Sequence, residues 1–209
     1  APSTTYYWET GSWHLAYNAA SDYNYNEEMP ALRRREAWRA TILRGRNFLE
    51  RGVRTNPDNW QISLTLGRLL SDPNKLVDYP AAAAAFKAAA DTGQAPPFVR
   101  RNEFFSLARS PGRESEALEM GRRLYANPSN RVSVLSSLMV ALECRADPSR
   151  SPYEVAISMF GSAKSAYEPL CDYWVRVRER YPLNGIAKAL QGLEETLAIP
   201  AEKSILKRK

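Results

Sequence analysis

The side chains that could support chemistry in this sequence are few and far apart. His14 is the only histidine, and a metal ion bound by a single chain needs several His, Cys, Asp or Glu ligands. Cys144 and Cys171 are the only cysteines, and a nucleophilic cysteine needs a nearby histidine as its base. His14 lies far away along the chain. The sequence therefore favours a packed or surface histidine and two buried, unpaired thiols.

The acidic residues show no catalytic arrangement either. The pairs Glu27-Glu28 and Glu194-Glu195 are adjacent in sequence, so on a helix their side chains point in different directions. General acid and base catalysis needs two carboxylates that face one substrate. The phosphate-binding pattern GxxxxGK[ST] does not occur. We therefore expect a protein that is not an enzyme, with no catalytic residue, no metal and no cofactor.

Composition limits the class of protein further. The 209 residues are 44% hydrophobic and 25% charged, as in ordinary globular domains, and no apolar window is long enough to span a membrane. The net charge is only +6, and the basic residues are scattered along the sequence, which argues against a nucleic-acid partner. An Ala-Pro-Ser start suits a chain cut after a signal peptide or after an anchor upstream of Ala1. We expect an extracytoplasmic or membrane-tethered protein, with the cytoplasm as the alternative.

Helical periodicity runs through most of the chain, and strand patterns are almost absent. One stripe of small and apolar residues steps alternately by four and three positions and stops before Pro57, which cannot continue a helix. The stripe consists of Trp38, Ile42, Gly45, Leu49 and Gly52. The fold class predicted from this pattern is all-α.

Five segments approximate a pattern in which a small residue is followed four positions later by a larger one, with a proline near the end; the third segment has Gly121 in place of the larger residue. They begin at Gly45, Ala82, Ala117, Ala156 and Ala187. The intervals between them are roughly 31 to 39 residues, which is the length of two short helices and their turns. The alanine-rich stretch DYPAAAAAFKAAADTG, from residue 78, is the clearest copy of the second helix.

The repeated segments resemble the tetratricopeptide repeat (TPR), whose second helix reads Ala-x3-Phe-x2-Ala. The matching residues are Ala82, Phe86 and Ala89, then Ala156, Phe160 and Ala163, with Leu66 and Gly67 at the Leu-Gly pair of a first helix. The resemblance implies a right-handed superhelical array of antiparallel helix pairs, an α-solenoid. We expect about five degenerate repeats over residues 30–200. An aromatic-rich cap helix over residues 1–29 should pack against the first repeat, and residues 201–209 should form a basic tail.

The resemblance also implies a function. First helices of TPR arrays line a concave groove that holds a peptide, and the corresponding positions here are Gln61, Arg68, Asn102, Arg109, Asp172 and Arg176. We therefore expect an interaction scaffold or assembly factor that binds a protein, an extended peptide or an acidic tail. Two alternatives remain open. One is the helical module of a larger enzyme, such as a cell-wall-acting enzyme, and the other is a nucleic-acid-binding helical repeat.

Overall fold

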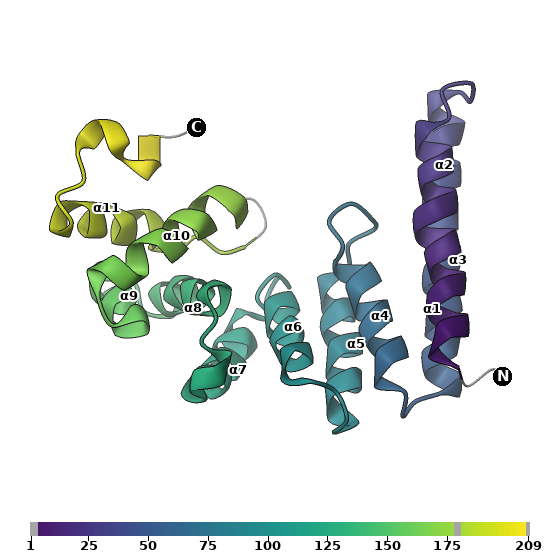
Figure 1. The fold of residues 1–209 in the computed structure, drawn as a ribbon, viewed down its shortest axis with the longest axis horizontal. Coiled ribbons are helices and arrows are strands. Elements are labelled where there is room, and N and C mark those ends of the chain that lie inside the picture. The colour runs from purple at the N-terminus through teal and green to yellow at the C-terminus, as the bar shows by residue number, and fades with distance from the viewer. Residues whose placement is uncertain (1–3, 178–180, 208–209) are drawn as a thin grey trace. The chain divides into compact units, whose positions relative to one another are not determined.

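The computed structural model describes residues 4–177 and 181–207, and the chain divides into two compact units, Ala1–Ser106 and Leu107–Lys209. The described residues form helices and turns with no strand, so the predicted all-α class is confirmed (Figure 1). None of the described helices is both long and apolar enough to cross a membrane. Each unit is considered separately below.

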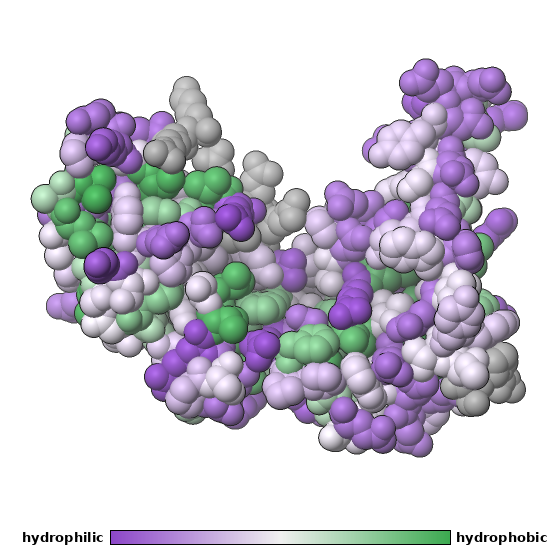
Figure 2. Space-filling model, viewed as in Figure 1, coloured by the Kyte–Doolittle hydropathy of each residue, from purple (hydrophilic) through white to green (hydrophobic). Residues whose placement is uncertain are grey.

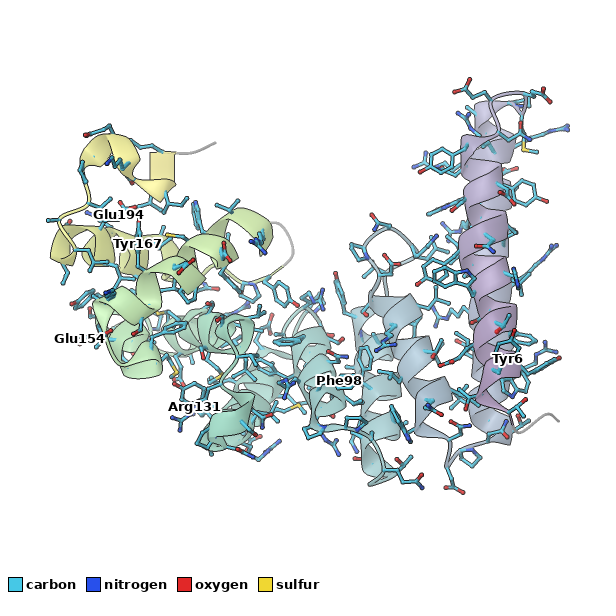
Figure 3. All side chains as sticks on the ribbon, viewed as in Figure 1. Tyr6, Phe98, Arg131, Glu154, Tyr167 and Glu194 are labelled. Carbon is cyan, nitrogen blue, oxygen red and sulfur yellow. The ribbon has the colours of Figure 1, made fainter. Side chains whose placement is uncertain are left out.

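The first unit begins with a helical hairpin. Three consecutive segments, α1 (Thr5–Trp13), the π-helix η1 (His14–Ala19) and α2 (Ala20–Tyr25), form one rod that packs along α3 (Ala31–Thr55). The buried ring of Trp8 lies 4.8 Å from that of Phe48 on α3, measured between centroids. Tyr6 and Trp13 are 77% and 53% exposed, and Tyr6 projects outward from α1 in Figure 3. Within the aromatic segment, Trp8 is therefore buried, whereas Tyr6 and Trp13 are exposed.

The alanine-rich stretch forms α5 (Tyr79–Asp91), which pairs with α4 (Trp60–Ser71). Asp78 caps its N-terminus, because its carboxylate accepts a hydrogen bond from the backbone N–H of Ala81 at 3.0 Å. Ala82 and Ala89 are fully buried, and the ring of Phe86 lies directly on Gly67 of α4. A Cβ atom at Gly67 would be 2.6 Å from that ring. The small residues are therefore required by the close packing of this pair.

The second unit follows α6 (Pro97–Leu107). It contains α7 (Glu114–Ala126), α8 (Ser133–Ala146), α9 (Pro152–Phe160), α10 (Ala163–Val177) and α11 (Ile186–Thr196). Short 3-10 turns cover Pro128–Asn130, Ala201–Lys203 and Ile205–Lys207. Every residue from Leu135 to Cys144 is buried, so α8 is the central helix of the unit.

One predicted helix is interrupted by a glycine. The repeat pattern places Ala156, Phe160 and Ala163 in a single helix, but α9 ends at Phe160, and Ala163 is the first residue of α10. Gly161 stands between the two helices with φ +84°, the left-handed conformation that commonly ends helices at glycine. The backbone N–H of Ser165 then donates to the hydroxyl of Ser162 at the start of α10. The prediction that these three residues share one helix is wrong.

The C-terminal segment packs on α11 as far as Lys207, and the last two residues of the expected tail lie outside the described part. The buried carboxylate of Glu194 accepts hydrogen bonds from the Tyr167 hydroxyl (3.2 Å) and the Ile205 backbone N–H (2.9 Å). Tyr167 and Glu194 come from α10 and α11 (Figure 3). Ser204 and Ile205 are themselves buried, so this part of the segment packs against the folded unit.

Both cysteines lie in the second unit as free thiols. Cys144, near the end of α8, is buried, and this burial raises the pKa of its thiol. Cys171 lies in α10 and is half-buried. A raised pKa keeps Cys144 protonated at neutral pH and therefore a weak nucleophile.

Candidate binding cleft in the first unit

A cleft of about 370 Å³ opens between the N-terminal rod and α4, with α3 beneath it. Its lining residues are Glu9, Thr10, Ser12, Trp13, Tyr17, Leu49, Thr65, Arg68 and Leu69. The buried side chains of Leu49 and Leu69 form an apolar floor. The rim is polar and aromatic, which is the usual composition of a ligand-binding pocket.

Two aromatic rings form one wall of the cleft. Trp13 and Tyr17 stack with their centroids 4.5 Å apart and their planes only 16° from parallel. Both residues lie where the rod changes from α1 to the π-helix η1, and such single π turns often occur at functional sites. Because the Trp13 ring is half exposed, the stack presents a flat aromatic surface to solvent.

Charged groups surround the phenol of Tyr17. Burial and then the nearby Asp72 carboxylate raise the pKa of Tyr17 to about 12, against the opposing effect of Arg68. The Lys75 ammonium lies 4.5 Å from the centroid of the Tyr17 ring, and burial lowers the pKa of Lys75. The phenol consequently stays protonated at neutral pH, so it is available as a hydrogen-bond donor and not as a base.

Glu9 and Arg68 bring opposite charges to the cleft. The hydroxyl of Thr65 on α4 donates a 2.6 Å hydrogen bond to the Glu9 carboxylate, which ties the rod to α4. Arg68 is exposed one turn further along α4. The cleft therefore combines an apolar floor, an aromatic wall, one fixed carboxylate and one exposed guanidinium. This combination suits the binding of a chain segment with an apolar side chain and an acidic neighbour.

The structure brings only one of the six predicted groove residues into this cleft. Arg68 lines it. Gln61, two turns earlier on α4, accepts a hydrogen bond from the Thr5 hydroxyl at 3.1 Å. Asn102 is half-buried on α6.

The other three predicted groove residues belong to the second unit. Arg109 was expected on the same helix as Asn102, but α6 ends at Leu107 and the guanidinium of Arg109 lies over the Tyr181 ring, 4.4 Å from its centroid. Asp172 and Arg176, both on α10, form an ion pair with each other at 3.4 Å.

The sequence also contained a signal for Trp13 and Tyr17, two cleft residues that were not predicted to bind a partner. Trp13 and Tyr17 are four positions apart in a helical segment, so they share a face. They belong to the cap that is predicted to pack against the first repeat, whereas Trp13 is exposed at the cleft. His14 is exposed beside them, and its Nδ1 atom lies 3.1 Å from the side-chain amide of Asn18. The described residues contain no group of three His, Cys, Asp or Glu placed to hold a metal ion.

Comparison with known proteins adds no relative. No protein-family model matches the sequence, and no curated protein or solved structure matches it either. The function must therefore be argued from the geometry of the chain.

Proposed function

We propose that this protein is a TPR-like binding scaffold whose first unit holds an extended peptide segment of a partner protein. The cleft beside Trp13 carries the proposal. A half-exposed tryptophan stacked on a tyrosine is a costly surface to leave in water, and Trp residues contribute most of the affinity at many protein interfaces. We expect the partner segment to place a bulky apolar side chain against this stack and a carboxylate on Arg68.

The proposed scaffold is a right-handed array of antiparallel helix pairs. Its support is the roughly 35-residue spacing of the small-x3-large pattern, together with the packing of Phe86 on Gly67 between α4 and α5. A helix pair this short cannot bury its apolar face alone, so neighbouring pairs must share a core. A crystal structure in which successive pairs are not related by one repeated right-handed rotation would contradict the array.

Peptide selection tests the binding function directly. A phage-displayed peptide library is selected on the immobilised full chain, and enriched peptides are synthesised and titrated by calorimetry. We expect the enriched sequences to combine an aromatic or aliphatic residue with a nearby acidic one. Trp13→Ala should weaken their binding about 30-fold or more, as truncation of a central tryptophan does elsewhere.

Matched variants give the control. Tyr25→Ala removes an equally conspicuous ring from the same rod, since Tyr25 is 76% exposed but lies outside the cleft. Lys164→Gln removes an exposed cation from the second unit, for comparison with Arg68→Gln. We expect the two control variants to change affinity less than about twofold. Selected peptides that bind equally well to the Trp13→Ala and Arg68→Gln variants would overturn the proposal.

A further inference from the structure

Helix α3 carries a concentration of positive charge that the sequence analysis missed. Between Ala31 and Thr55 there are eight arginines, two glutamates and no lysine, so this one helix has a net charge of +6. That value equals the net charge of the whole chain. The earlier interpretation of scattered basic residues is therefore wrong for this segment. Arginines spaced along 25 residues look dispersed in sequence, but they all lie on a single helix.

Part of this charge forms a straight row. Arg33, Arg44 and Arg51 are exposed and lie eleven and seven residues apart. Those steps are close to three and two helical turns, so the three side chains share one line about 27 Å long. Arg54 is exposed one turn beyond Arg51. We call these four residues the arginine row.

The arginine row has no carboxylate partners among the described residues: none of its guanidinium groups takes part in an ion pair. Arg46, on another side of the same helix, bonds Glu50 at 2.8 Å and Asp78 at 3.1 Å. Four unneutralised guanidinium groups along one side of a helix repel each other, and an anionic ligand would relieve that repulsion.

An aromatic surface adjoins one end of the arginine row. The Arg51 guanidinium lies 5.5 Å from the centroid of the Phe48 ring. That ring is 5.4 Å from the ring of Tyr7, which is 46% exposed. A base could stack on Tyr7 while the neighbouring phosphates contact Arg51 and Arg54, the combination by which proteins hold single-stranded nucleic acids.

The acidic residues of the N-terminal rod lie away from this end of the arginine row. Glu9 is engaged with Thr65 on the α4 side of the rod. Asp22, Glu27 and Glu28 belong to the opposite end of the hairpin, which is coloured hydrophilic in Figure 2. They are near Arg33 in sequence. Between Arg44 and Arg54 the one acidic residue is Glu50, which is paired with Arg46.

We propose that the arginine row is a binding surface for single-stranded nucleic acid, with phosphates on its guanidinium groups and a base on Tyr7. The planar guanidinium fork matches two phosphate oxygens, and a linear polyanion matches a linear row. A lipid bilayer would require large apolar side chains to insert, and the only exposed ones on α3 are Leu32 (70%) and Leu43 (37%). This inference reverses the sequence-based expectation against nucleic acid and is independent of the peptide-binding cleft.

The test is fluorescence anisotropy of labelled (dT)20 and (rU)20 titrated with the full chain at 50 and 200 mM salt. Four phosphate contacts on a single strand predict a slope of about −2.8 in log K against log salt, a loss of about 50-fold over this range. The triple change Arg44→Gln, Arg51→Gln and Arg54→Gln should reduce the slope to about −0.7 and abolish binding at 200 mM.

Two further triple variants keep the test decisive. Lys164→Gln, Lys188→Gln and Lys203→Gln make the same charge change at exposed positions of the second unit and should leave binding unchanged within about twofold. Replacing the three arginines by lysine preserves the charge. It should preserve the salt slope while lowering affinity several-fold, which also controls for misfolding.

A pair of ring variants tests the stacking contact separately. Tyr7→Leu should weaken oligonucleotide binding about fivefold or more, and Tyr6→Leu, which removes the more exposed neighbouring ring, should not.

Three outcomes would overturn the proposal. The first is no measurable oligonucleotide binding at 50 mM salt. The second is an equal loss of binding in the arginine-to-glutamine and lysine-to-glutamine triple variants, which would show a response to net charge alone. The third is tighter, arginine-dependent binding to poly-glutamate or to vesicles containing 30% phosphatidylserine, since that would assign the arginine row to an acidic protein or a membrane.

Discussion

The ring of Phe86 leaves no room for a side chain at Gly67, and Gly67→Ala tests this close packing. The new Cβ atom would lie 2.6, 2.7 and 2.9 Å from three carbon atoms of the Phe86 ring, whereas carbon atoms in ordinary contact are about 3.5 to 4.0 Å apart. Phe86 is itself buried, so its ring has no open space to move into. We expect overpacking to cost roughly 1 to 3 kcal/mol, partly offset by about 1 kcal/mol of helix propensity gained on replacing glycine.

The net effect should be a loss of up to about 2 kcal/mol in the free energy of unfolding. Urea unfolding followed by tryptophan fluorescence measures it, because four of the five tryptophans lie in the first unit. A double-mutant cycle with Phe86→Leu isolates the contact: the smaller side chain should make Gly67→Ala less costly by about 1 kcal/mol. A Gly67→Ala variant as stable as wild type, with no coupling to Phe86, would refute the packing argument.

Three further predictions concern other parts of the chain. Ala89→Leu should destabilise the first unit by roughly 1 to 3 kcal/mol in urea unfolding, whereas Ala88→Leu on the exposed face should change stability by less than about 0.5 kcal/mol. Hydrogen bonds from an arginine lower the pKa of Glu143 in the folded state. The ionised carboxylate therefore stabilises the fold above the unfolded-state pKa of about 4.3, and this stabilisation is lost as pH falls through the folded-state pKa. Glu143→Gln should flatten the acid limb of a plot of urea midpoint against pH. Glu194→Ala should speed amide exchange in residues 201–207 about tenfold or more, measured by mass spectrometry.

The sequence predicted helices well where local chemistry determines them. The alanine run of α5, with an Asp cap before it and a turn after it, has the boundaries that its residue types indicate. The break at Gly161 was missed because a glycine inside a small-x3-large pattern fits a helix as well as it fits the end of one. Only the left-handed backbone at that residue distinguishes the two, and no single-sequence pattern encodes it.

The candidate cleft was harder to predict than the helices. Arg68 was predicted from the groove positions that the TPR resemblance implies, and it is exposed on α4. Trp13 and Tyr17 belong to the predicted aromatic cap, but their exposure depends on how the rod rests on α3 and α4. The contact with α4 joins residues more than 50 positions apart in sequence. Periodicity reports which residues share a face of one helix and does not report which neighbour covers it.

The N-terminal rod packs on α3 through one side. Two other sides of the rod stay exposed, and each is proposed to bind a different partner. Trp8 is buried with Phe48 and fixes the rod on α3, while Trp13 faces the cleft at α4 and Tyr7 lies beside the arginine row. Substitutions at Trp13 and at Arg51 therefore change exposed groups without removing the Trp8 contact. If both proposals hold, Trp13→Ala should weaken peptide binding about 30-fold or more and leave the salt-dependent oligonucleotide binding intact. The glutamine variants of the arginine row should weaken oligonucleotide binding and leave peptide binding intact. Loss of both activities in either variant would show that the two surfaces are one site.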